Sequence, residues 1–425
     1  MKRLGLLVLI GYTASAGVAH AATYYVAKNG NNGNTCAQAQ STSTPKLTIA
    51  EGLKCLVAGD TLFVRAGNYD EGINNNIPSG TSWSSKVRIA NYNGETVWLR
   101  PSAIGVNNNG FGVWLGGNGL SPRYIEIDGI NVDASNMQNG VGLSDAGGAN
   151  PNNILIQNLE IIGSPKASYA QTYVAGSDHR LLNVKIHGSG PGGCGLPCST
   201  YGIYVAGNRV LVDGCDIYDV NGGGIHIYNS RGLSENNTVR NCRIHDITRS
   251  GDARLFGILA NGNNHQIYNN LIYGLKLPGT TGTDGSQVAI VAGPNGTKIW
   301  NNTIANNTGY GIKVDPGSVN MEVRNNIAYG NSGPAFTSGG SGTTESNNLF
   351  GVDPQFVNPS GNDFKLKPES RAVDAGVNVS AVTTDLSGVS RPQGRIHDIG
   401  AFEFSGQPTA SGPPAPPTGV RIVSN

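Results

Sequence analysis

The sequence predicts an all-β fold: a single-stranded, right-handed parallel β-helix, which is a solenoid of three sheets, with an N-terminal capping helix. One short phrase recurs, in which two β-type segments flank Asn or Gly. A second phrase of the type Gly-Ile-x-Val lies between its copies. Gly supplies 62 of 425 residues, about twice its usual share, which suits a chain of many turns. A repeat of short strands at this period is typical of a solenoid.

The first phrase carries the turn between two strands. Its copies begin at residues 127, 156, 181, 212, 239, 267, 299 and 323, so the spacing varies between 24 and 32 residues. Alternation gives each strand one inward and one outward face. Asn and Gly tolerate the left-handed conformation that a sharp bend needs. We expect the turn residues to stack and to bond side chain to backbone between coils, as Asn269, Asn301, Asn325 and Asn347.

The second phrase supplies the third strand of each coil. It recurs at residues 202–205, 224–227, 257–260, 289–292 and 311–314. Each coil therefore contains a strand, a one- or two-residue turn, a second strand, a loop of variable length and a third strand. Long loops at 187–201, 246–256 and 274–287 precede three of these third strands, and such loops are where solenoids usually carry function.

The first residues predict export. Lys2 and Arg3 precede the apolar run Leu4–Ile10, and Ala19-His20-Ala21 resembles a cleavage site, so residues 1–21 are expected to be a signal peptide. We therefore expect a secreted protein, in the periplasm, outside the cell or on its surface. Removal of two of the 29 basic residues leaves 27 against 28 acidic ones, which does not favour a nucleic-acid partner. No later apolar run predicts a membrane span, and we expect a monomer.

The remaining segments differ in composition. Residues 22–100 are expected to form the N-terminal cap and first coils, because Thr48 and Glu51 form a capping box and Gly59 suits the end of a short helix. Such a helix would cover the open edge of the solenoid. Residues 101–350 hold the repeats, 351–404 a C-terminal cap region, and 405–425 a Pro- and Gly-rich tail of linker type.

Six cysteines in an exported protein predict three disulfides, Cys36–Cys55, Cys194–Cys198 and Cys215–Cys242. Cys215 and Cys242 occupy the same place in successive repeats, about 4.8 Å apart, which is within disulfide range. They could equally be a stacked pair of reduced thiols. A zinc site made of Cys194, Cys198 and His187 lacks a fourth ligand and the usual spacing.

Two stretches carry resemblances to known families. The run Ala58–Tyr69 and the Asn-turn repeats resemble the secreted right-handed β-helix proteins of the pectate-lyase-like superfamily. The segments 353–356, 372–376, 391–392 and 398–403 resemble the C-terminal region of choice-of-anchor Q proteins. The first resemblance implies lyases, hydrolases, epimerases or binders of polysaccharides. It also implies that the substrate cleft lies along the sheet after the long loop, which here is the Gly-Ile-x-Val sheet.

A lyase acting on a uronate needs a group that neutralises the carboxylate, a base and an acid. The outward residues of the cleft sheet and its loops offer catalytic candidates in His226, Arg254, Tyr204 and Tyr228, and substrate-binding candidates in Asn261, Arg249, Asp252 and Lys313. Adjacent coils are about 4.8 Å apart, so the group around His226 can reach one sugar. Lys313 is three coils away, about 14 Å, and cannot act on the same atom. The prediction is a lyase that cleaves a uronate-containing glycan by β-elimination.

Other interpretations stay open. Outward rings on a solenoid often only stack, and His187, Tyr218, His245 and Tyr273 are expected to form such a ladder on another sheet. Lys313 beside Asp315, and Arg254 near Asp252, suit simple ion pairs. The cleft sheet has no acidic cluster, so no metal site is assigned and a role for calcium is left open. A glycoside hydrolase or an epimerase is a weaker alternative, since paired carboxylates are missing. The main rival is a non-catalytic glycan-binding, adhesin or structural protein.

Overall fold

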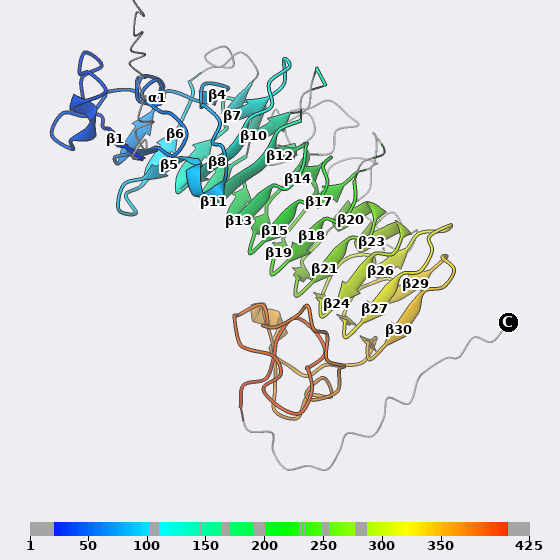
Figure 1. The fold of residues 1–425 in the computed structure, drawn as a ribbon. Helices are drawn as coiled ribbons and strands as arrows, with labels where there is room; N and C mark the ends of the chain where they lie inside the picture. Colours follow the sequence, from blue (N-terminus) through cyan, green and yellow to red (C-terminus); the bar gives the residue numbers. More distant parts are fainter. Residues whose placement is uncertain are drawn as a thin grey trace, which may run out of the picture.

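The computed structural model describes residues 21–102, 110–144, 147–148, 150–163, 170–189, 200–228, 232, 234–248, 255–276 and 287–406. The chain winds along one axis as a stack of coils, and its C-terminal segment lies against the side of that stack (Figure 1). Strands in parallel pairing build three ladders that run the length of the solenoid. Among these residues, no helix is long and apolar enough to cross a membrane.

The first ladder and the second ladder meet at the Asn or Gly turn and together make a 21-stranded sheet. The first ladder contains β1 (Thr23–Val26), β2 (Thr61–Val64), β5 (Val87–Asn91), β8 (Arg123–Asp128), β11 (Asn152–Ile162), β13 (Arg180–His187), β15 (Leu211–Asp213), β18 (Thr238–Arg240), β21 (Gln266–Tyr268), β24 (Lys298–Trp300), β27 (Glu322–Arg324) and β30 (Thr344–Ser346). The second ladder contains β3 (Gly67–Tyr69), β6 (Val97–Leu99), β9 (Ile130–Asp133), the ends of β11 and β13, β16 (Asp216–Tyr218), β19 (Arg243–His245), β22 (Leu271–Tyr273), β25 (Thr303–Ala305), β28 (Ile327–Tyr329) and β31 (Leu349–Phe350).

The third ladder is a separate sheet of ten strands and corresponds to the Gly-Ile-x-Val phrase. It contains β4 (Ile73–Asn74), β7 (Phe111–Gly116), β10 (Asn139–Ser144), β12 (Ala170–Val174), β14 (Thr200–Val205), β17 (Gly222–Ile227), β20 (Leu255–Asn263), β23 (Gln287–Asn295), β26 (Tyr310–Val314) and β29 (Phe336–Ser338). Three ladders of parallel strands confirm the predicted three-sheet solenoid.

The core is a continuous column of apolar side chains, and each coil contributes its inward residues to it. In the third ladder the inward positions are filled by fully buried isoleucines that pair in register from coil to coil: Ile203, Ile225, Ile258, Ile290 and Ile312. Burial of each such side chain contributes about 1.5–3 kcal/mol before the entropy cost of ordering it. Because each coil buries its apolar face only against its neighbours, the column holds the outer residues at a fixed spacing.

The turn residues confirm the predicted left-handed conformation, but most of the side-chain bonds between coils come from a neighbouring residue. Asn269, Asn301, Asn325 and Asn347 all have φ between 49° and 54°, as the left-handed turn requires. The bonds from side chain to backbone up the stack come mainly from the next residue, which points inward. Asn270, Asn302, Asn326 and Asn348 form this inner asparagine ladder, in which each Oδ1 accepts from the backbone N–H of the coil before it at 2.9–3.0 Å.

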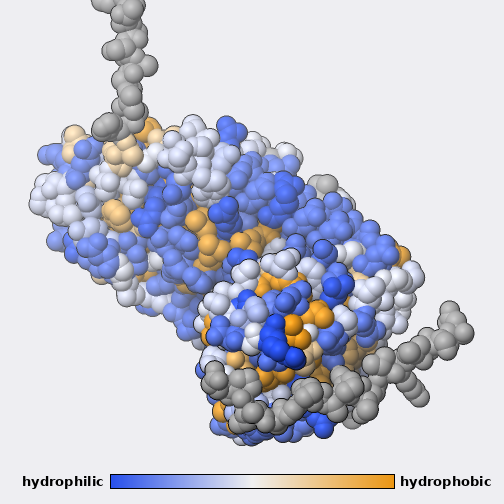
Figure 2. All heavy atoms as spheres, turned by 60° about the horizontal axis from the view of Figure 1, so that its bottom comes forward, coloured by the Kyte–Doolittle hydropathy of each residue, from blue (hydrophilic) through white to orange (hydrophobic). Residues whose placement is uncertain are grey.

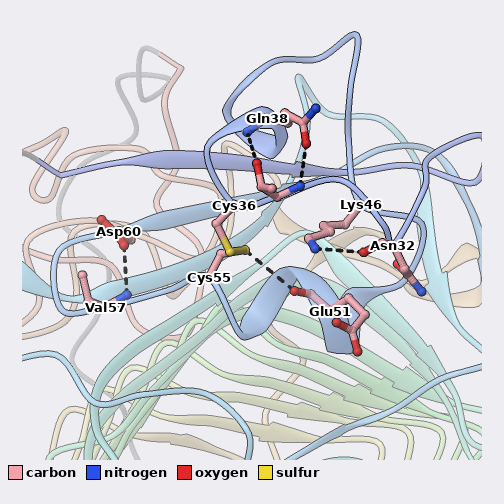
Figure 3. The surroundings of a disulfide bond; sticks show 9 residues. Asn32, Cys36, Gln38, Lys46, Glu51, Cys55, Val57 and Asp60 are labelled. Atoms are coloured by element: carbon pink, nitrogen blue, oxygen red, sulfur yellow. Dashed lines mark hydrogen bonds between the residues drawn. A yellow bond between two sulfur atoms is a disulfide. The ribbon is translucent and has the colours of Figure 1, made fainter.

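The N-terminal region contains little helix, and its capping role stays a prediction. α1 is only Ile49–Leu53, with Thr48 as its N-cap, and its buried side chains join the core of the first coils. Glu71 accepts from the first two backbone N–H groups of α1 at 3.0 Å. The predicted Cys36–Cys55 disulfide is present and ties the preceding loop to the end of α1 (Figure 3). Two short 3-10 helices, Gln38–Gln40 and Trp83–Ser85, complete this region.

The prediction of a Cys215–Cys242 disulfide is wrong. Both are free thiols and both are buried. Cys242 occupies the place of an inner-ladder asparagine: its N–H donates to Asn270 Oδ1 at 3.0 Å, and its thiol donates to the Arg240 carbonyl at 3.1 Å. The Cys242 thiol therefore points to a backbone carbonyl and forms no disulfide with Cys215. Cys194 and Cys198 lie outside the described residues.

The C-terminal unit, residues 353–404, packs against the side of the stack and not on its end. It contacts the first asparagine of four turns, and we call these residues the outer asparagines: Asn269, Asn301, Asn325 and Asn347. It contains the antiparallel pair β32 (Phe356–Asn358) and β33 (Asp363–Leu366), joined by the 3-10 helix Pro359–Gly361. Asn325 makes a two-way contact with the Val377 peptide, at 2.8 and 2.9 Å. The face turned forward in Figure 2 is mostly hydrophilic, with small hydrophobic patches on and beside this unit. Residues 1–20 and 407–425 lie outside the described residues, so the signal peptide and the tail stay predictions.

Candidate functional site

The predicted cleft residues form one straight outer row on the third ladder. Tyr204, His226, Leu259, Val291 and Lys313 are direct partners on successive strands, β14 to β26. They face away from the core because the residue before each of them is one of the inward isoleucines. The alternation read from the sequence therefore gives the correct direction for these side chains. At about 4.8 Å a step, Lys313 stays about 14 Å from His226.

Aromatic rings gather around His226. We call Tyr201, Tyr204, His226, Tyr228 and Phe256 the aromatic cluster. The centroid of the imidazole lies 4.8 Å from that of Tyr201, 5.1 Å from Tyr204, 5.2 Å from Tyr228 and 5.5 Å from Phe256. The tyrosines at 201 and 204 meet the imidazole edge to face. The structure thus brings three of the four predicted catalytic residues, Tyr204, His226 and Tyr228, into contact distance.

The cluster differs in exposure from one side to the other. His226 is only 9% exposed, whereas Tyr228 is 39% exposed and Tyr204 is half-buried. A ring set of this kind offers apolar faces together with hydroxyl groups, which is the combination that stacks on sugars and bonds their hydroxyls.

A shallow groove continues from the cluster. It has a volume of about 350 Å³ and is lined by Tyr228, Asn261, Gly262, Gly293, Pro294, Asp315, Pro316 and Ser318. Tyr228 therefore belongs both to the cluster and to the groove, and the predicted binding residue Asn261 is in the groove wall. Lys313 pairs with the groove residue Asp315 at 3.3 Å, as the simpler interpretation expected. Because both side chains are about a quarter exposed, this pair contributes little stability.

Two outward residues do not belong to an open surface. Leu259 and Val291 follow His226 in the outer row, yet they are 4% and 5% exposed. They pack with Phe256 and Val288 into a small apolar cluster of their own. Alternation predicts the direction of a side chain but not whether other residues cover it. The open path from His226 toward Lys313 therefore runs through the groove and not along the outer row.

His265 is a site residue that the sequence analysis missed. Its Nε2 is 3.3 Å from the carbonyl oxygen of Asn261, and its Nδ1 accepts from the backbone N–H of Asn237 at 3.2 Å. These contacts require the neutral ring with the proton on Nε2. His265 thus holds the end of β20, and with it Asn261, in place. His179 does the same for β12, with contacts to Ala175 and Ile154.

Both buried histidines should make the fold sensitive to acid. Burial lowers the pKa of His179 and of His265 from 6.5 to about 4, although a backbone contact of each ring opposes the shift. A lowered histidine pKa gives stability that is present above pH 6.5 and is lost as the pH falls toward 4. Each histidine should cost about 3 kcal/mol across that window. Urea unfolding at pH 7.5 and at pH 4.5 would measure how much unfolding free energy is lost on acidification. We expect this loss to be about 3 kcal/mol smaller in the His265→Gln variant than in wild type.

His245→Gln is the matched control for this experiment. Burial alone would lower the pKa of His245, but hydrogen bonds to Asp216 and Asp246 raise it above 6.5. Its stabilising effect is therefore present at low pH and is lost as the pH rises through the folded-state pKa. Removing it should steepen the acid loss instead of reducing it. A His265→Gln profile parallel to that of wild type would contradict the role given to His265.

The second ladder carries the predicted stack of rings. His187, Tyr218, His245 and Tyr273 stack with centroids 4.8–5.1 Å apart and planes within 13° of parallel. The stack ends against Phe364 of the C-terminal unit, 5.1 Å from Tyr273. The prediction that these four rings form a ladder on a sheet other than the Gly-Ile-x-Val sheet is confirmed.

Three predicted residues cannot be placed. Arg249, Asp252 and Arg254 lie outside the described residues. Within the described ranges, no group of three or more His, Cys, Asp or Glu side chains could hold a metal ion. The groove wall offers a ligand the polar side chains of Tyr228, Asn261, Asp315 and Ser318.

A larger hollow lies elsewhere. A notch of about 480 Å³ separates the turns of the middle coils from the C-terminal unit, and its wall includes Asp213, Asn241 and Asp385. The carboxylates of its wall are already occupied: Asp213 binds Arg240 and Asn241, Asp216 binds His245, and Asp385 accepts the backbone N–H groups of Ser387 and Val389. We therefore assign the candidate site to the aromatic cluster and the groove, not to the notch.

Comparison with known proteins agrees with this geometry. Residues 173–350 match the family model described as the right handed beta helix region. A pectate lyase structure, Pel9A, superposes with a TM-score of 0.59 at 15% identity, over 91% of this chain and 97% of that one. A rhamnogalacturonan lyase structure gives 0.58 at 15% identity, over 79% and 90%. No curated protein matches the sequence. The chain is therefore a right-handed parallel β-helix protein of the pectate-lyase-like fold.

Proposed function

We propose that this protein binds a uronate-containing polysaccharide on its third ladder and cleaves it by β-elimination. The observation that carries the proposal is the junction at Tyr228, where the aromatic cluster around His226 opens into the groove that holds Asn261. Stacking surfaces, an imidazole and an amide meet there within the reach of one or two sugar rings. The two superposed solved structures are named as lyases, which is consistent with the proposal and supports the fold alone.

The proposed reaction needs few groups. Asn261 donates hydrogen bonds to the uronate carboxylate, which makes the proton on the adjacent carbon more acidic. The neutral imidazole of His226 takes that proton, the electron pair forms the carbon–carbon double bond, and the glycosidic C–O bond breaks. The hydroxyl of Tyr228 or Tyr204 protonates the leaving oxygen. Arg254 and Arg249 are proposed as additional partners of the carboxylate, as the sequence suggests.

One observation favours a second candidate, in which the protein binds the glycan and does not cleave it. His226 is 9% exposed and is held among four aromatic rings. Such an arrangement also suits a rigid platform, and aromatic platforms bind sugars without any proton transfer. The two candidates predict the same affinity and different turnover.

The deciding experiment uses ultraviolet absorbance to follow unsaturated uronate, with pectate, alginate and glycosaminoglycans as substrates, with and without calcium. If the protein is a lyase, His226→Ala should lower kcat at least about 100-fold, while retention on an affinity gel changes little. Tyr228→Phe should reduce turnover through loss of the hydroxyl and keep the ring. His245→Ala, a histidine on the second ladder, is the matched control and should leave both properties unchanged.

The outcomes separate the candidates. Turnover that survives in His226→Ala would remove His226 from the mechanism. Retention of a polymer without any absorbance change would select the binding candidate. If the protein shows no retention and no turnover with any of these polymers, the lyase candidate and the binding candidate are both rejected.

A further inference from the structure

We propose that Trp114 forms a second sugar-binding subsite, about 19 Å from His226 along the solenoid axis. The ligand would then be a polymer that lies parallel to the axis, and a short oligosaccharide would fill only part of the site. This inference rests on the proposed function and deepens it, because it names the length class of the ligand.

Trp114 belongs to the same outer row as His226. On the third ladder it pairs with Gly142, which pairs with Tyr173, which in turn pairs with Tyr204, the direct partner of His226. Four strand-to-strand steps of about 4.8 Å give the distance of about 19 Å. The row therefore places Trp114 on the same side of the solenoid as the candidate site, on the side away from the groove.

Phe111 and Gly142 hold the Trp114 ring in place. Its ring centroid lies 4.4 Å from that of Phe111, with the planes tilted by 48°. A Cβ on Gly142 would come within 2.6 Å of the Trp114 ring and 2.7 Å of the Phe111 ring. The two rings therefore lie over the backbone of Gly142, and only glycine permits this. An indole held in this way against the sheet is a preformed and rigid platform.

The rings between the two ends keep the path continuous. Tyr173 and Tyr204 stack with centroids 5.6 Å apart and planes 21° from parallel. Phe111, Trp114, Tyr173 and Tyr204 are all half-buried, so each retains accessible surface. In the opposite direction the outer row becomes buried at Leu259 and Val291. The accessible rings thus extend from His226 toward Trp114, beyond the length of one sugar.

The chemistry of this run fits a polysaccharide. Sugar rings present apolar C–H faces that stack on aromatic rings, with hydroxyl groups at their edges. A run of separate rings contacts successive sugars of one chain, so each ring adds affinity only when the chain is long enough to reach it. Trp114 offers the largest ring of the run and is its outermost member in this direction.

The test is the dependence of affinity on chain length. Isothermal titration calorimetry would compare the trisaccharide and the decasaccharide of pectate and of alginate, with His226→Ala as the common background so that the bound chain is not cleaved; wild type here means wild type at all other positions. We expect wild type to bind the decasaccharide of its preferred polymer roughly tenfold more tightly than the trisaccharide. Trp114→Ala should remove this advantage and leave trisaccharide affinity unchanged, whereas Trp114→Tyr should retain most of it.

Two further variants make the result decisive. Gly142→Ala places a methyl group under both rings and should reduce the length advantage without removing any aromatic residue. Trp300→Phe alters a buried indole of the first ladder and should change nothing. If wild type binds both lengths and Trp114→Ala weakens them equally or not at all, the Trp114 subsite is rejected and the proposed function stands. If wild type binds neither length of either polymer, the Trp114 subsite is rejected, whereas the proposed function is rejected only when glycosaminoglycans also show neither retention nor turnover.

Discussion

The Asn302→Leu variant is expected to lower the free energy of unfolding by about 3–5 kcal/mol. Asn302 is fully buried at the centre of the inner asparagine ladder. Its Oδ1 accepts from the backbone N–H and the Nδ2 of Asn270, both at 3.0 Å. Its Nδ2 donates to the Ile267 carbonyl at 2.9 Å and to Asn326 Oδ1 at 3.0 Å. Leucine has a similar shape, so the cost comes from buried polar groups of two neighbouring coils that lose their partners.

Urea unfolding followed by circular dichroism would measure this effect. Because solenoids can unfold by segments, hydrogen exchange in β21, β24 and β27 should show the loss centred on that coil. Asn306→Gly is the matched control: Asn306 is exposed, has φ of 56°, and makes one contact of 3.5 Å to Pro359. Glycine accepts that φ, so the change should stay within about 0.5 kcal/mol. A loss below about 1 kcal/mol in Asn302→Leu would show that the ladder is not a main source of stability.

The Arg391→Met variant is expected to destabilise the C-terminal unit by about 3–5 kcal/mol. Arg391 and Glu403 form an ion pair at 2.6 Å in which both side chains are completely buried. The guanidinium also donates to the carbonyls of Gly400 at 2.7 Å and Asp398 at 3.2 Å. Methionine fills most of the space, but the Glu403 carboxylate then stays buried without its counter-charge. Separation of the unit from the outer asparagines is the expected consequence.

Limited proteolysis within residues 353–404, together with thermal unfolding, would detect this separation. The double variant Arg391→Met, Glu403→Leu should be markedly more stable than the single one, because replacing both charges removes the unpaired carboxylate. Arg371→Met is the matched control, since Arg371 is an exposed arginine of the same unit. If single and double variants were equally unstable, packing and not charge would account for the role of Arg391.

Much of the fold could be predicted because each coil repeats the same local physics. The left-handed turns, the inward isoleucines and the stacked rings of the second ladder all follow from alternation and repeat spacing. The inner asparagine ladder could not be read in the same way. Where two asparagines are adjacent, as at Asn301 and Asn302, residue type does not tell which side chain turns inward. The left-handed conformation of the first one decides this in the structure.

The candidate site was partly predictable for a similar reason. Register placed Tyr204, His226 and Tyr228 together, but the burial of Leu259 and Val291 depends on how they pack with Phe256 and Val288 across neighbouring coils, which alternation does not give. His265 left a signal that could have been used: Gly262-x-x-His265 repeats Gly176-x-x-His179 at the same place in another coil. The side-on position of the C-terminal unit left none, since its contacts join residues between 28 and 122 positions apart.

The outer row takes one residue from each strand of the third ladder, so it sets the distances between its residues along the solenoid axis in steps of one coil. Distances along it change only in whole coils, because a residue inserted into a loop bulges outward and leaves the strand register intact. Deleting the coil that carries β12 would bring Trp114 one step closer to His226, and duplicating it would move the two one step apart. On the proposed function, gaining or losing a coil would therefore change the length of glycan that reaches from His226 to Trp114, with no change to the residues around His226.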